Sequence, residues 1–206
     1  MDYILHVDKY LNIIIQNFGV WSYCLLALVI FAETGFVVTP FLPGDSLLFA
    51  AGTFAATGSF NLAWLCMALA VPAILGDTVN YTIGKLFGQK LFTNDQSRIF
   101  KKKYLEMTQR FYEKHGRKTI FLARFVPIIR TFAPFVAGMG KMEYLHFFIS
   151  NVSGGIVWVL ALVLAGFYFG NIPVVRNNFS LVILAIIVIS ILPAVIEFLR
   201  HRKSNI

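Results

Sequence analysis

Charge is scarce in this chain of 206 residues, and basic charge is absent from most of its first half. Only 14% of the residues are charged and 58% are hydrophobic, whereas about a quarter of a typical soluble domain is charged. No lysine or arginine occurs between Leu11 and Gly84. This composition excludes an ordinary soluble domain. It predicts a single integral membrane domain over 1–206, because no polar stretch is long enough to form a separate soluble unit.

Cysteine and histidine are also sparse, with two and four residues. Cys24 and Cys66 lie in apolar segments, where we interpret them as small packing residues rather than as disulfide partners or metal ligands. The histidines lack the spacing of a metal site, and no Ser/His/Asp or Cys/His set stands near a break in the apolar segments. The sequence therefore predicts neither an enzyme nor a metal or other cofactor.

The basic residues that the chain does have are concentrated in two places. Ten of them fall within 85–118, and Arg200, Arg202 and Lys203 lie near the C-terminus. Nucleic-acid binding is one interpretation of such runs. In a membrane protein the positive-inside rule explains them better, so we predict that 85–118 and the C-terminus are cytoplasmic and that no nucleic acid binds.

Apolar stretches of two lengths alternate along the chain, and they predict an all-α membrane protein. Stretches of about 20 residues can cross a bilayer, whereas those of about 10–14 residues are typical of re-entrant segments. The expected elements are amphipathic helices over 3–17 and 104–115, broken re-entrant hairpins over 20–58 and 119–141, and spanning helices over 61–84, 152–170 and 181–196. Proline and glycine break the hairpins, namely Pro40, Pro43 and Gly44 in the first and Pro127, Pro134 and Gly138 in the second.

The two hairpins open to opposite sides of the membrane if the segment 85–118 and the C-terminus are both cytoplasmic. The chain then divides into a first repeat over 1–84, the basic segment over 85–118, the core of a second repeat over 119–170, and a C-terminal spanning helix and tail over 171–206. An inverted repeat with broken helices is the architecture of secondary transporters, which bind their substrate where the repeats meet.

Glu33 and Asp45 flank the break in the first hairpin. Ionisable groups at membrane depth are costly, and they usually face a cavity, a partner or a substrate. We interpret the two carboxyl groups as a protonatable pair that couples or gates transport. A second interpretation is open for Asp45, because an aspartate after Pro43 and Gly44 can cap a helix that starts at Ser46.

Arg124 and Arg130 provide the matching basic pair in the second hairpin. A spacing of six positions would not align them on a straight helix, but Pro127 between them bends the chain so that both can converge. An arginine can bind phosphate or carboxylate oxygens through two parallel hydrogen bonds, which predicts an anionic substrate. The alternative is a structural ion pair with Glu33 and Asp45, and both interpretations hold if the substrate displaces the carboxylates.

Asp77 and Asn80 are three positions apart in the helix expected over 61–84, so they share a face. They could line a path or bind the backbone of a broken helix, and structural support is our interpretation. We assign the three tryptophans to the core and to the membrane interface.

Two motifs resemble the DedA family, a branch of the wider group that contains the VTT domain. The first motif is an acidic residue with Gly, Pro and Pro-Gly-Asp, which stands here as Glu33-Thr34-Gly35, Pro40 and Pro43-Gly44-Asp45. The second motif is Arg-Phe-x-Pro-x-x-Arg followed by Pro and Ala-Gly-Met, which runs here from Arg124 to Met139. The chain resembles the family over nearly its whole length.

The resemblance implies a multi-pass lipid transporter of the bacterial inner membrane, with Glu33, Asp45, Arg124 and Arg130 as its functional residues. Family members are linked to the translocation of undecaprenyl phosphate, and relatives move or scramble phospholipids. We therefore expect a proton-coupled lipid translocase in which the arginines receive a lipid phosphate. Its expected partners are that lipid or a phospholipid, protons and the bilayer. The alternatives are a phospholipid scramblase, a proton-coupled ion or small-solute antiporter, and a scaffold that transports nothing.

Overall fold

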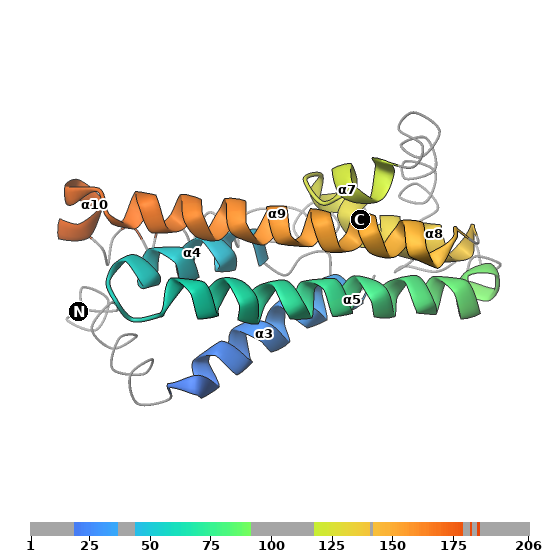
Figure 1. The fold of residues 1–206 in the computed structure, drawn as a ribbon, viewed down its shortest axis with the longest axis horizontal. Coiled ribbons are helices and arrows are strands. Elements are labelled where there is room, and N and C mark those ends of the chain that lie inside the picture. The colour runs from blue at the N-terminus through green and yellow to red at the C-terminus, as the bar shows by residue number, and fades with distance from the viewer. Residues whose placement is uncertain are drawn as a thin grey trace, which may run out of the picture. The chain divides into compact units, whose positions relative to one another are not determined.

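The computed structural model describes residues 19–36, 44–91, 118–140, 142–178, 182 and 185. Every regular element in this part of the chain is helical (Figure 1), which confirms the all-α prediction. The helices are α3 (Val20–Gly35), α4 (Gly44–Ala56), α5 (Leu62–Leu91), α7 (Thr119–Ala123), α8 (Pro127–Met139), α9 (Tyr144–Gly170) and α10 (Pro173–Asn177). Outside the described residues lie Pro40, Pro43, the helices expected over 3–17 and 104–115, and almost all of the helix expected over 181–196.

Two helices are long and apolar enough to cross a membrane, α5 through its stretch Leu62–Phe87 and α9 over its whole length. They are the two long helices of Figure 1, and they agree with the spanning helices expected over 61–84 and 152–170. However, α9 begins earlier than predicted, at Tyr144. Its first turns accommodate Asn151 because the amide of that side chain donates a hydrogen bond to the carbonyl of Ile74 on α5, at 3.0 Å.

Glu33 and Asp45 both lie inside helices, although the sequence predicted that they flank a break. α3 continues to Gly35, so Glu33 lies in its last turn and not beyond it. α4 begins at Gly44, so the second interpretation of Asp45, as the cap of a helix starting at Ser46, is wrong. Asp45 lies instead in the first turn of α4, where a carboxylate is still favoured by the helix dipole.

The break in the second hairpin falls between α7 and α8. α8 begins with Pro127, at a position where the missing N–H of proline costs nothing because it would have no partner within the helix. Pro134 lies inside α8 without ending it. α4 and α8 have 13 residues each and each is followed by a long helix, so the order of elements repeats. The inverted orientation of the two repeats stays a prediction.

The chain divides into two compact units. Unit 1 consists of Met1–Leu26, Pro43–Cys66 and Ala161–Ile206, and unit 2 consists of Ala27–Leu42 and Met67–Leu160.

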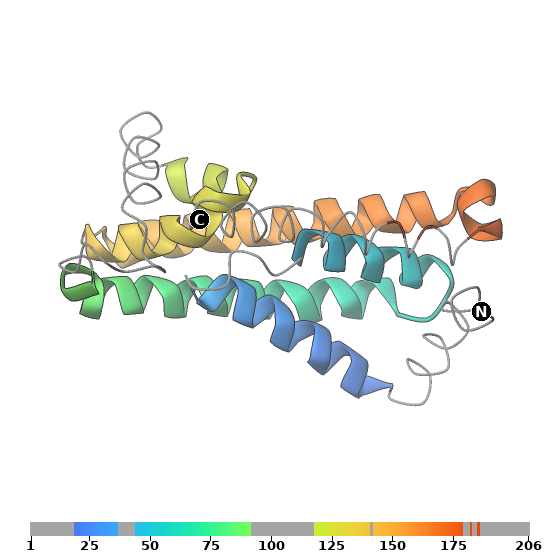
Figure 2. The same ribbon diagram turned by 180° about the vertical axis from the view of Figure 1, so that it is seen from behind.

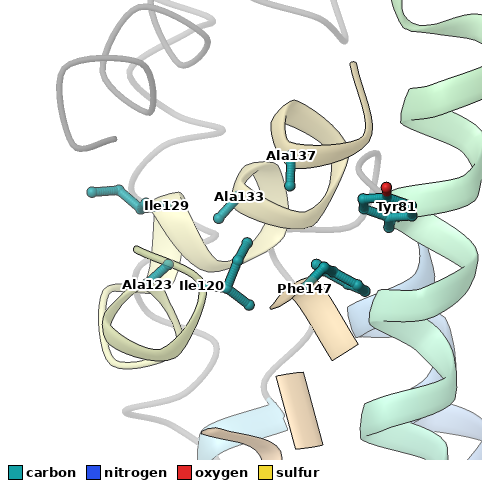
Figure 3. Close-up of a cluster of buried hydrophobic side chains, with 7 residues drawn as sticks. All are labelled: Tyr81, Ile120, Ala123, Ile129, Ala133, Ala137 and Phe147. Carbon is teal, nitrogen blue, oxygen red and sulfur yellow. The ribbon is translucent and has the colours of Figure 1, made fainter. Parts of the chain in front are cut away.

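The hydrophobic core of unit 2 is formed by α5, α7, α8 and the first half of α9 (Figure 3). One cluster of its buried side chains consists of Tyr81, Ile120, Ala123, Ile129, Ala133, Ala137 and Phe147. The ring of Tyr81 stacks on that of Phe147, with 4.4 Å between the centroids, and its hydroxyl donates to the carbonyl of Met142 at 2.5 Å. This core fixes the short helices α7 and α8 against the two long ones.

Glycine brings the backbones of α5 and α8 together within unit 2. Gly84 of α5 lies against the backbone of Phe135, and Gly138 of α8 lies against the backbone of Tyr81. A Cβ at either glycine would collide with a carbonyl oxygen of the opposite helix. Gly138, which was predicted to help break the second hairpin, lies inside α8 and has a packing role.

The same device joins α4 to the last turns of α9 in unit 1, where the two helices run alongside each other in both views (Figures 1 and 2). Gly52 of α4 faces the backbone of Val163, and Gly166 of α9 faces the backbone of Phe49. The ring of Phe49 also packs on that of Phe169, at 5.4 Å between centroids. Backbone atoms cannot move aside as side chains can, so this contact requires the absence of a Cβ.

Replacing Gly166 by leucine should destabilise the protein by more than the 1–3 kcal/mol or so that is typical of overpacking, because the new side chain meets the Phe49 backbone. The matched control is Ala165→Leu, since Ala165 is the neighbouring residue of α9 and is exposed. The melting temperature of both variants is measured in detergent, from the fraction of protein that stays monodisperse on heating. Equal melting temperatures for the two would contradict the packing of α4 against α9.

Candidate functional site

The break between α7 and α8 presents two buried arginines from unit 2. Arg124 closes α7, and the chain then becomes extended at Val126 before α8 begins at Pro127. Arg130 follows in the first turn of α8, where its N–H donates to the carbonyl of Val126 at 2.9 Å. Both arginines are almost completely buried. The break thus allows the two side chains to converge, as the sequence analysis predicted.

Arg124 is held by acceptors from both spanning helices. Its Nη2 donates to Oδ2 of Asp77 at 2.6 Å, to the side-chain oxygen of Asn151, and to the carbonyl of Ala73 at 3.3 Å. Asp77 and Ala73 are one turn apart on α5, and Asn151 belongs to α9. The partner of Arg124 is therefore Asp77, to which the sequence analysis gave only a supporting role.

Arg130 is held by Glu33. Its Nη2 donates to Oε1 of Glu33, and both side chains are buried. The pair joins the first turn of α8 to the last turn of α3, residues that lie 97 positions apart in the chain. An ion pair of the arginines with Glu33 and Asp45 was the structural alternative to substrate binding, and the structure shows the part of it that involves Glu33.

Both guanidinium groups lie over the same indole ring. The Cζ atom of Arg130 is 4.8 Å and that of Arg124 is 5.8 Å from the ring centroid of Trp158. Both distances fall within the range of about 6 Å over which a cation is attracted to a ring face. Trp158 is buried and belongs to the middle of α9.

Asn80 secures the backbone beside the Glu33–Arg130 pair. Its amide donates to the carbonyl of Thr34 at 3.2 Å and to that of Thr131 at 2.8 Å. Thr34 and Thr131 directly follow Glu33 and Arg130. One side chain of α5 therefore bonds to the backbones of both α3 and α8 beside the ion pair. Asn80 therefore binds the backbone of the broken helices, which agrees with the supporting role expected for it.

Asp45 belongs to unit 1 and is half-buried in the first turn of α4.

Asn151 and Trp158 were not predicted as site residues. They lie seven positions apart on α9, with Gly154 and Gly155 between them. The available signal was Asn151 itself, because a polar amide inside an apolar spanning helix needs a buried partner.

The site is rich in donors and formally neutral. Two guanidinium groups face two carboxylates, so an anion can bind only if a carboxylate is protonated or displaced. Among the described residues, Nε and Nη1 of Arg124 are buried without a hydrogen-bond partner. The described ranges contain no group of three or more His, Cys, Asp or Glu side chains that could hold a metal ion. The arrangement is suited to binding an anion through N–H groups.

Comparison of the sequence with known proteins places the chain in a family. The VTT domain matches residues 42–168, which include Asp77, both arginines and Trp158. The chain is 56% identical to "Protein DedA" of Escherichia coli (strain K12), over 99% of this chain and 94% of that protein. The chain belongs to the DedA family.

Two further relatives carry names that mention a membrane. "Uncharacterized membrane protein ML0287" of Mycobacterium leprae is 44% identical over 86% of this chain and 79% of its own length. "Inner membrane protein YqjA" of Escherichia coli (strain K12) is 31% identical over 74% of this chain and 69% of its own length. No solved structure matches the chain. The composition, the two spanning helices and these relatives together establish a membrane protein.

Proposed function

We propose that this protein is a proton-coupled lipid translocase of the bacterial inner membrane, which moves undecaprenyl phosphate or a related phosphate-headed lipid. The observation that carries the proposal is the convergence of Arg124 and Arg130 on Trp158 inside an apolar membrane domain. Buried guanidinium groups favour phosphate because their planar N–H donors match its oxygens. A lipid also fits the context, because its tail can remain in the bilayer while only the headgroup enters the protein.

Glu33 is the group through which protons act in this proposal. When ionised, its carboxylate neutralises Arg130. Protonation removes that negative charge, so that a phosphate can take its place beside the arginine. Protons supplied from the more acidic outer side would bias movement of the phosphate toward the cytoplasm. Asp45 is proposed as the second gating carboxylate, and Asp77 keeps Arg124 compensated throughout.

The proposed topology has two re-entrant hairpins of opposite orientation, with the segment 85–118 and the C-terminus in the cytoplasm. The repeated order of elements and the ten basic residues within 85–118 support it. Broken helices are tolerated at membrane depth where protein covers them, and Val126 of the α7–α8 break packs against the buried core of unit 2.

The decisive experiment reconstitutes the protein in liposomes that contain undecaprenyl phosphate and follows the leaflet exposure of the lipid with and without a pH gradient. We expect gradient-dependent movement that is lost in Arg124→Ala and Arg130→Ala, because each removes a phosphate donor. Lys85→Ala is the matched control, since Lys85 is a basic residue on the exposed surface of α5.

Each other result assigns a different function. Movement that ignores the gradient but needs both arginines identifies a scramblase. Movement no faster than in empty liposomes overturns the lipid-phosphate proposal, and proton–solute exchange is then the next activity to measure. Equal losses in the Lys85→Ala control would show that the effect is one of surface charge.

A further inference from the structure

One face of α9 is shaped around Arg124. Asn151, Gly154, Gly155 and Trp158 follow at the spacing i, i+3, i+4, i+7, which aligns residues on one side of a helix. Asn151 accepts a hydrogen bond from the guanidinium. A Cβ at Gly154 would lie 3.2 Å from Cδ of Arg124, and one at Gly155 would lie 3.3 Å from its Nη2. The two glycines therefore allow the side chain of Arg124 to lie close to α9, and Gly155 does the same for Ile74, whose Cγ1 would be 3.0 Å from a Cβ at that glycine.

Trp158 completes this face, and its ring also contacts the guanidinium of Arg130 from α8. Two guanidinium groups that meet at one ring repel each other, so their separation has to be imposed by their surroundings. Asp77 and Glu33 supply the compensating charge, each to one arginine. The indole ring differs from both carboxylates in two ways. It attracts both guanidinium groups at once, and it does so without accepting a strong hydrogen bond from their N–H groups.

An aromatic ring can hold a guanidinium and leave its donors usable. When a guanidinium stacks on a ring, the interaction uses the face of the guanidinium plane, whereas the N–H groups lie in that plane and can still reach oxygen acceptors. A carboxylate partner consumes N–H groups, and a ring does not. This difference makes a tryptophan suitable for holding two arginines that must also bind a phosphate.

We propose that Trp158 is a positioning residue, whose ring holds Arg124 and Arg130 at the separation at which both donate to one phosphate headgroup. The inference rests on the proposed function for its substrate. It extends that function because the spacing of the two phosphate-binding arginines is then set by an aromatic side chain as well as by the ion pairs.

The test uses a protein in which Trp158 is the only tryptophan. Trp21 and Trp64, the other two, are 73% and 65% exposed, so Trp21→Phe with Trp64→Phe leaves the site unchanged. Biosynthetic incorporation of mono-, di- and tetrafluorotryptophan then weakens the attraction of the ring for cations with little change of shape. We expect undecaprenyl phosphate movement to fall stepwise, by about tenfold over the series. A packing role predicts equal rates at equal melting temperatures, and that result would overturn the proposal.

A second measurement separates this inference from the proposed function. The ¹⁹F NMR signal of 5-fluorotryptophan at position 158 is recorded in detergent without added lipid, so that it needs no transport. Arg124→Gln and Arg130→Gln should each move the signal, and Lys85→Gln should not. If the signals move but the protein transports no lipid, the proposed function fails while the shared contact holds. If neither arginine variant moves the signal, the positioning role is wrong whatever the protein transports.

Discussion

Replacing Asp77 by asparagine should destabilise the protein by about 3–5 kcal/mol, which is the cost expected when one partner of a buried ion pair is removed. Asparagine has the shape of aspartate and can still accept a hydrogen bond from Nη2 of Arg124, but it carries no charge. The guanidinium of Arg124 would remain buried near Arg130 with its main compensating charge gone. The loss should appear as a large fall in melting temperature in detergent and as reduced yield of monodisperse protein.

The matched control is Glu143→Gln, which likewise replaces a carboxylate by an amide. Glu143 directly precedes α9. Glu143 pairs with His146 at 2.8 Å, but the two side chains are 67% and 46% exposed. An exposed pair contributes no more than about 1 kcal/mol, so this variant should melt close to the unchanged protein. Similar losses for the two variants would mean that Arg124 is solvated.

A double variant distinguishes charge from packing at the same site. Asp77→Leu combined with Arg124→Met removes both charges and fills a comparable volume, and such replacements of buried pairs are often neutral or stabilising. We expect the double variant to recover most of the stability lost in Asp77→Asn while transporting no lipid phosphate. Stability and transport would thereby be separated at Arg124.

The burial of Arg124 and Arg130 could be predicted because it depends only on their apolar neighbours in the chain. Their convergence could also be predicted, since Pro127 forces a break between them. The partner of Arg124 could not. Whether Asp45 or Asp77 reaches a given arginine depends on the packing and rotation of whole helices, which the local sequence does not determine. An ion pair with Glu33 was correctly offered as an alternative for the arginines, although α3 continues past Glu33 to Gly35.

Trp158 shows why composition conceals such a site. The chain contains 32 aromatic residues if its 21 Phe, 8 Tyr and 3 Trp are added together, so an aromatic in an apolar helix signals only core or lipid contact. Its role depends on two arginines that lie more than 25 positions away in the chain. The spanning helices were predictable for the opposite reason, because length and hydropathy are local properties. The start of α9 was less so, since Asn151 looks like a loop residue until its partners on α5 are known.

Exchanging the Glu33 and Arg130 side chains, as Glu33→Arg with Arg130→Glu, should reduce lipid-phosphate movement by roughly 100-fold or more, the scale expected for disabling a buried charged contact. Coulomb attraction between the two positions is unchanged by the exchange, so a scaffold that only pins α3 to α8 would keep its function. A translocase would not, because a carboxylate would then stand beside Trp158 and Arg124, where the phosphate has to bind.

The exchange is informative only if the pair still forms, so the melting temperature of the exchanged protein is compared with that of Glu33→Gln, in which Arg130 has lost its partner. The exchanged protein should be the more stable of the two and yet inactive. Arg130→Lys gives the intermediate case, since lysine keeps the charge but lacks the planar pair of donors, and it should transport more slowly than the unchanged protein. Full transport by the exchanged protein would show that Arg130 holds the fold and is no ligand of the substrate. Full transport by Arg130→Lys would show that charge alone, without two-point binding, is sufficient.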